Sequence, residues 1–261
     1  MPKLTTRPGF FTSPSAVKCL PFILTLAASA AHAGVIDTFD VSHDYSGGNV
    51  AGTIWNGMLN ADHLVSGDAS ITNAGRLTLV PTDFSGWEGG GSDAPTLYVL
   101  VDGDFDASVQ VAAMSTGDYS DGGLIARVPD LADAGPGEDW LTMNYFGASG
   151  FDHARSVDDT TPADFAFSPL RPFLRMTRSG NTFAFYSKTT AGDAWDLRDT
   201  LERPDFAGVT TLQVGLQFGT FFVNPGSVQF DNFMLNADPV PEPASAMLGL
   251  LGLALLAARR R

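Results

Sequence analysis

The chain has little cysteine and little glutamate: one Cys and four Glu stand against 25 Asp in 261 residues. Cys19, the one thiol, lies in an N-terminal segment that we expect to be removed. The remaining protein then has neither disulfides nor thiolate chemistry, so a hydrophobic core or a bound metal has to stabilise it. Aspartate is a poor helix former and a common turn residue, so its excess over glutamate favours loops between strands.

Basic residues are also scarce. Between Gly34 and Val240 there are nine Lys or Arg and 28 Asp or Glu, a net formal charge of −19. Such a surface repels polyanions as a whole, which excludes a nucleic-acid-binding or anionic-lipid-binding protein. No His-Glu-x-x-His or Gly-x-Ser-x-Gly pattern is present, so the sequence predicts neither a zinc hydrolase nor a serine triad.

Residues 1–33 have the pattern of a secretory signal peptide. Lys3, Arg7 and Lys18 supply a basic region, residues 20–28 are almost entirely apolar, and residues 31–33 read Ala-His-Ala. We expect a signal helix that is handled by the Sec export machinery and cut by signal peptidase before Gly34. The alternative is an uncleaved anchor, although the apolar run falls short of the ~20 residues that span a bilayer.

The C-terminal segment has three parts: a Pro-Glu-Pro motif, an uncharged stretch over residues 246–258 and three terminal arginines. This arrangement resembles the PEP-CTERM sorting signal of Gram-negative bacteria. The resemblance implies transient insertion of a hydrophobic sorting helix into the inner membrane, processing by an exosortase, and delivery to the cell surface or extracellular matrix alongside exopolysaccharide. The alternative is a plain anchor that is never cut. The residues that match are Pro241, Glu242, Pro243, Arg259, Arg260 and Arg261.

Between these ends, residues 34–236 predict one all-β domain, followed by a linker and the sorting tail over residues 237–261. Residues 212–218 alternate between apolar and polar or glycine positions, which is typical of a strand with one buried face. Residues 72–75 and 179–181 contain the Asn and Gly that favour hairpin turns. Further strands are expected over residues 96–101, 105–113 and 227–235.

Residues 173–187, with Gly192 and Trp195, resemble a hairpin of the concanavalin A-like lectin/glucanase superfamily. Residues 37–40 and 230–233 match its usual first and last strands. The resemblance implies a LamG-like, two-sheet antiparallel jelly-roll sandwich in which the first and last strands are neighbours. These motifs belong to the scaffold, so they do not imply an activity.

Catalysis is not expected. Glycoside hydrolysis uses two carboxylates flanking the bond that is cut, and the Glu-x-Asp-x-x-Glu strand of the superfamily's glucanases is absent. Asp102, Asp104 and Asp106 follow each other at spacings of two, which we interpret as a charged turn at a strand end. The alternative is a glycan hydrolase with an unrecognised carboxylate pair.

Calcium is the metal that the composition favours, because it takes hard oxygen ligands from Asp side chains. If the first and last strands are neighbours, Asp37 or Asp40 approaches Asp231, and a Ca²⁺ between them clamps the chain ends. The apolar phase of residues 228–235 shifts after Asp231, which predicts a β-bulge there. The alternative is that these carboxylates only solvate strand ends.

Four aromatic residues are the candidates for contact with a sugar ring: Trp87 in a glycine-rich segment, then Trp55, Tyr119 and Trp140. The alternative for each is burial in the core. The sequence therefore predicts an exported, non-catalytic surface or matrix protein whose β-sandwich binds extracellular polysaccharide. A purely structural adhesin is the remaining possibility.

Overall fold

The computed structural model describes residues 34–82, 85–88, 91–115, 120–129, 139–147, 151–158, 161–220 and 226–239. These residues form antiparallel strands, and the helical segments that the structure describes are single 3-10 turns, so the all-β prediction is confirmed. None of the described helices is long and apolar enough to cross a bilayer. The predicted signal and sorting helices lie outside the described residues.

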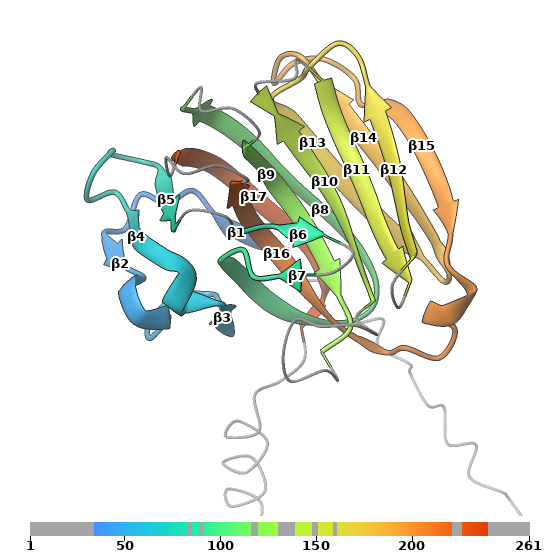
Figure 1. Cartoon of the computed structure of the whole chain (residues 1–261), viewed down its shortest axis with the longest axis horizontal. Helices are drawn as coiled ribbons and strands as arrows, with labels where there is room; N and C mark the ends of the chain where they lie inside the picture. Colours follow the sequence, from blue (N-terminus) through green and yellow to red (C-terminus); the bar gives the residue numbers. More distant parts are fainter. Residues whose placement is uncertain are drawn as a thin grey trace, which may run out of the picture. The chain divides into compact units, whose positions relative to one another are not determined.

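Two layers of strands lie against each other (Figure 1). The first has the spatial order β12, β11, β10, β9, β16 and the first half of β8. The bounds of these strands are Thr161–Phe167 for β12, Phe151–Asp158 for β11, Trp140–Phe146 for β10, Ser120–Arg127 for β9, Thr211–Thr220 for β16 and Thr96–Met114 for β8. The short β3, Gly57–Leu59, pairs with the other side of β8.

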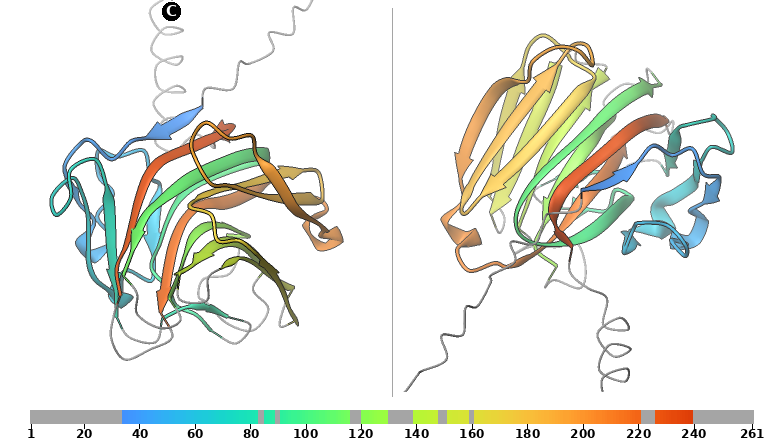
Figure 2. Two further views of the ribbon diagram at one scale, coloured as in Figure 1. Left: turned by 90° about the horizontal axis from the view of Figure 1, so that it is seen from above. Right: turned by 180° about the vertical axis from the view of Figure 1, so that it is seen from behind.

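The second layer contains β15, β14, β13 and the second half of β8. Beyond β8 lies β17, which pairs both with β1 and with the series β5, β4 and β2. The bounds are Asp196–Glu202 for β15, Thr182–Lys188 for β14, Phe173–Ser179 for β13, Val228–Pro239 for β17, Val35–Asp37 for β1, Leu77–Pro81 for β5, Leu64–Ala69 for β4 and His43–Asp44 for β2. Figure 2 shows from above how the two layers stack.

Strand β8 belongs to both layers. Residues 96–102 pair with β16, whereas residues 105–110 pair with β13. Gly103, at φ 70°, lies between the two halves, where glycine adopts the left-handed backbone without strain. The separate sheets that we predicted are thus joined by hydrogen bonds through one strand. The charged turn expected over residues 102–106 is wrong, because the strand continues through it as a bend.

The hydrophobic core fills the space between the layers, and apolar residues on the inward face of each strand supply it. The hairpin predicted at residues 179–181 joins β13 to β14 in the register Ser179↔Thr182. Every second residue of these strands points inward, and the residues between them face outward. The inward set in the two layers includes Leu124, Met143 and Leu216 facing Leu174, Met176 and Phe185.

The first and last strands are neighbours, as predicted, with the register Val35↔Leu235 (Figure 2). The register of β17 on β8 shifts between Asp231 and Met234, and Asn232 has φ 51°, which confirms the predicted bulge. The predicted linker begins too early, because β17 continues to Pro239. A proline at the last position of a strand removes no needed donor, so it ends the ladder there.

Candidate functional site

Trp87, the first candidate for sugar contact, is buried rather than exposed. It lies in β6 (Trp87–Glu88), which pairs with β7 (Gly91–Ser92), and its side chain is 2% exposed. Its ring packs edge-on against Trp140 at a centroid distance of 5.6 Å, and its Nε1 donates to Thr96 Oγ1 at 3.0 Å. Trp87 therefore packs against Trp140, where its large ring and its N–H both find partners.

A row of buried polar side chains lies on the same face of the first layer as Trp140. Gln217 Nε2 donates to Asn144 Oδ1 at 2.8 Å, and Asn144 Nδ2 donates to Asp121 Oδ2 at 2.9 Å. All three side chains are at most 4% exposed. These two hydrogen bonds pair polar groups that would otherwise be costly to bury, and they link β9, β10 and β16.

Trp55, the second candidate, and Asp37, a predicted calcium ligand, form a structural pair. The Trp55 ring lies 4.8 Å from that of Phe233, and its Nε1 donates to Asp37 Oδ2 at 3.0 Å. The other Asp37 oxygen accepts the backbone N–H of Phe39 at 2.8 Å. Trp55 is therefore core, and both oxygens of Asp37 hold the N-terminal segment against it.

The remaining two predicted calcium ligands do not join Asp37. Asp40 is exposed and accepts a hydrogen bond from Thr38 Oγ1 at 2.7 Å. Asp231 forms an ion pair with Arg76 instead of meeting a carboxylate. Among the residues that the structure describes, no three His, Cys, Asp or Glu side chains are arranged to hold a metal ion. The described residues therefore do not fit the predicted site. Tyr119 and the sorting-motif residues lie outside the described ranges.

A groove of about 590 Å³ lies on the outer face of the second layer, and we call it the outer groove. The strands β1, β17, β8, β13 and β14 and the segment before β15 form it. Two of its apolar side chains, Ile36 and Met234, are 57% and 50% exposed. The lining residues are Gly34, Val35, Ile36, Asp106, Ser108, Arg175, Lys188, Trp195, Met234, Leu235 and Asn236.

Aromatic rings and cations are packed together along one wall of the outer groove. The Lys188 ammonium lies 4.6 Å from the centroid of the Trp195 ring, and the Arg175 guanidinium lies 4.9 Å from that of Tyr186. Arg175 also makes a bidentate pair with Asp106, with Nε to Oδ1 and Nη2 to Oδ2 at 2.7 Å each. These hydrogen bonds raise the pKa of Arg175, and the pair holds its guanidinium in one orientation.

The turn at residues 179–181, from which we predicted a hairpin of the scaffold, also determines which side chains form this wall. A turn at residues 179–181 places Arg175 opposite Tyr186, and Phe173 opposite Lys188. Because the alternate residues of both strands point into the core, these four side chains lie on the outer face. The position of Trp195 follows from no such rule, because it lies in the loop before β15.

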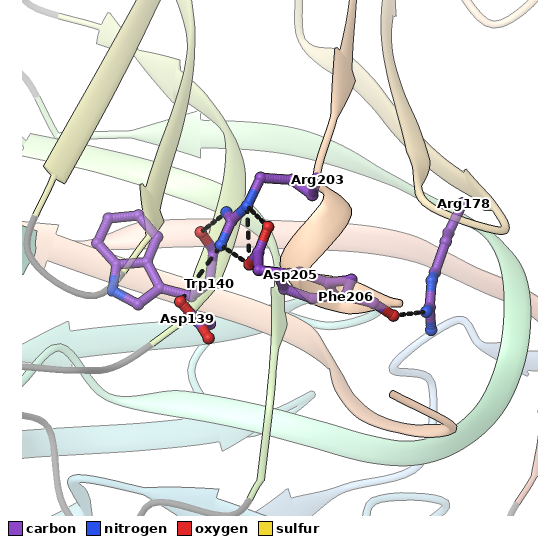
Figure 3. A network of polar contacts seen from close by, with 6 residues as sticks. All are labelled: Asp139, Trp140, Arg178, Arg203, Asp205 and Phe206. Atoms are coloured by element: carbon purple, nitrogen blue, oxygen red, sulfur yellow. Dashed lines mark hydrogen bonds and ion pairs between the residues drawn. The ribbon is translucent and has the colours of Figure 1, made fainter. Parts of the chain in front are cut away.

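A second polar network holds the two layers together at one end (Figure 3). Arg203, 4% exposed, donates from Nη2 to Asp205 Oδ2 at 2.6 Å and to Asp139 Oδ1 at 3.4 Å. The Phe206 ring lies 4.7 Å from this guanidinium, and the Phe206 carbonyl accepts from Arg178 Nη2 at 3.1 Å. Arg203 forms ion pairs with Asp139 and Asp205, and Arg178 donates to backbone carbonyl oxygens, so the network stabilises the fold.

Comparison with protein families identifies one segment of the chain. Residues 239–261 match the PEP-CTERM protein-sorting motif. The chain is therefore of the class that carries this C-terminal sorting signal, which implies export and sorting by an exosortase. No curated protein matches the sequence.

Solved structures with the same architecture have low sequence identity to the chain. A functionally unknown protein from Saccharomyces cerevisiae is 18% identical, with a TM-score of 0.50 over 64% of this chain and 89% of that one. The GH43 BlXynB protein from Bacillus licheniformis is 14% identical, with a TM-score of 0.52 over 77% of this chain and 39% of its own, longer chain. At such identities these likenesses show the fold alone, an antiparallel β-sandwich, and nothing of the chain's activity.

Proposed function

We propose that this protein is an exported surface or matrix component that binds extracellular polysaccharide, without catalysis, in the outer groove. The observation that carries the proposal is the composition of the groove: the Trp195 ring and exposed apolar side chains stand beside carboxylate, amide, hydroxyl and ammonium groups. Sugars bind to such surfaces, because apolar ring faces pack on apolar and aromatic groups while hydroxyls take up hydrogen bonds. The volume also falls within the range of small-ligand sites.

The carboxylate content of the outer groove favours binding over hydrolysis. Among its lining residues Asp106 is the one carboxylate, and both of its oxygens accept hydrogen bonds from Arg175. Glycoside hydrolysis uses a pair of carboxyl groups with separate roles, so this groove lacks the usual means for it.

The test is a binding series with soluble and insoluble polysaccharides, in which release of reducing ends is measured on the same samples. Trp195→Ala should weaken binding by about tenfold or more, because it removes the largest contact surface of the groove. Leu197→Ala is the matched control, since Leu197 is 57% exposed on the neighbouring strand but does not line the groove. Turnover would indicate the hydrolase alternative, and absence of any binding would indicate a purely structural role.

A further inference from the structure

The outer groove differs in charge from the rest of the domain. Residues 34–240 contain 28 acidic and nine basic residues, about three acids for each base. The lining of the groove reverses this ratio, with two bases, Arg175 and Lys188, and one acid, Asp106. The groove is thus a cationic site within an acidic surface.

The two bases of the groove are not equivalent. The charge of Arg175 is compensated by its bidentate pair with Asp106. Lys188 is the one lysine between Gly34 and Val240, and its Nζ donates to the carbonyl oxygen of Ala191 at 2.6 Å. Among the described residues it forms no ion pair, and its contacts with Trp195 and Phe173 leave its charge uncompensated. An ammonium group has three N–H donors, so two remain for a ligand.

We infer that the outer groove selects acidic over neutral polysaccharide, with the Lys188 ammonium binding a carboxylate or sulfate of a sugar residue that packs beside Trp195. This inference rests on the proposed function. The acidic remainder of the surface repels a polyanion, so contact with an acidic polymer is confined to the groove, where Lys188 supplies the attraction.

Removal of the predicted signal peptide would add a second positive charge to the outer groove. Gly34 lines the groove, and cleavage before it, as residues 31–33 predict, creates an α-ammonium group at that position. An α-amino group ordinarily has a pKa of ~8, so below that pH it would carry a positive charge.

The experiment compares polymers that differ in charge alone. The exported protein is titrated with polygalacturonate and its methyl ester, and with dextran sulfate and dextran, at low and high salt. We expect each acidic polymer to bind at least about tenfold more tightly than its neutral partner at low salt, the strength of one hydrogen-bonded charge. High salt should reduce this preference.

Variants at Lys188 assign the preference to one residue. Lys188→Gln should remove most of the preference and leave binding of the neutral polymers unchanged, whereas Lys188→Arg should retain it. Arg198→Gln is the matched control, since it removes the same charge from β15, where Arg198 donates to the carbonyl oxygen of Ser168 outside the groove. A preference for carboxylate alone or sulfate alone identifies which acidic group is bound.

Two outcomes overturn the inference and are distinguishable from each other. If neutral and acidic polymers bind alike, or if Lys188→Gln keeps the preference, the inference is wrong while the proposed function stands, provided that Trp195→Ala loses binding. If no polysaccharide binds to the wild-type protein, the proposed function fails and the inference fails with it.

Discussion

Arg175 and Asp106 face each other across β13 and β8, joined by two hydrogen bonds of 2.7 Å. The side chains are 26% and 39% exposed, so water weakens the attraction. We expect Asp106→Asn and Arg175→Gln each to lower the free energy of unfolding by about 1 kcal/mol. In a double-mutant cycle the two losses should not add, because both variants break the same pair. Additive losses in urea unfolding would contradict the pair.

Asp231 and Arg76 give the second prediction, which replaces the calcium clamp. Asp231 is 18% exposed and its carboxylate is bound by the Arg76 guanidinium, so Arg76→Gln should lower the free energy of unfolding by about 1–2 kcal/mol. Asp231→Asn should lower the free energy of unfolding by a similar amount. We expect a chelator to leave the thermal melting curve unchanged. A melting temperature that rises with calcium in the wild type and not in Asp231→Asn would restore the clamp.

Gly215 and Gly192 form a matched pair for a packing test. A Cβ on Gly215, in β16, would lie 1.8 Å from the carbonyl oxygen of Leu97, whereas one on Gly192 would meet no atom within 4 Å. Gly215→Ala should therefore cost about 3 kcal/mol or more of stability, and Gly192→Ala less than about 0.5 kcal/mol. Equal denaturation midpoints would show that β8 and β16 lie farther apart than described.

The buried carboxyl group of Asp152 makes the free energy of unfolding depend on pH. Burial raises the pKa of its carboxyl above the ordinary 3.8, against the opposing effects of Ser187, of the Arg171 N–H at 2.8 Å and of nearby arginines. The pKa of this carboxyl is higher in the folded than in the unfolded protein. Its protonated form therefore contributes stability below the ordinary pKa, and this contribution is lost as the pH rises through the raised value. Asp152→Asn keeps an acceptor but no charge. Its stability relative to wild type should increase between about pH 3 and pH 7, and parallel pH profiles would contradict this.

Processing at both chain ends is the fifth prediction. In a host that has the sorting enzyme, the surface-released protein should begin at Gly34 and should have lost the residues after about Pro243. Intact-mass measurement checks both ends at once. Released protein that still contains Arg259, Arg260 and Arg261 would mean that the tail acts as an uncut anchor.

Local signals predicted the local features of this fold. Ser179, Gly180 and Asn181 were enough to place a hairpin, because turn chemistry acts within a few residues. The phase shift after Asp231 was enough to place a bulge. The pairing of the first and last strands came from resemblance to a known fold, since nothing local specifies a contact between residues 35 and 235.

What the sequence did not predict depends on contacts between distant residues. Strands β11 and β12 were missed because Phe151–Asp158 and Thr161–Phe167 carry polar and acidic residues that resemble loops. Trp87 was predicted to be exposed because its glycine neighbours are typical of a loop, yet its ring packs against that of Trp140. Arg76 reaches Asp231 over 155 residues, a pairing that no spacing rule specifies.

The register of β1 on β17 determines how the domain responds to tension. Because the strands are antiparallel, Gly34 lies near Asn236. A force that pulls these two ends apart therefore breaks the hydrogen bonds between β1 and β17 one residue pair at a time, and not all at once as in shear. Strand β1 is held to β17 by three such pairs, whereas β17 is held to β8 by ten. Since β1 forms one wall of the outer groove, a load between these ends would open that wall before the rest of the sandwich yields.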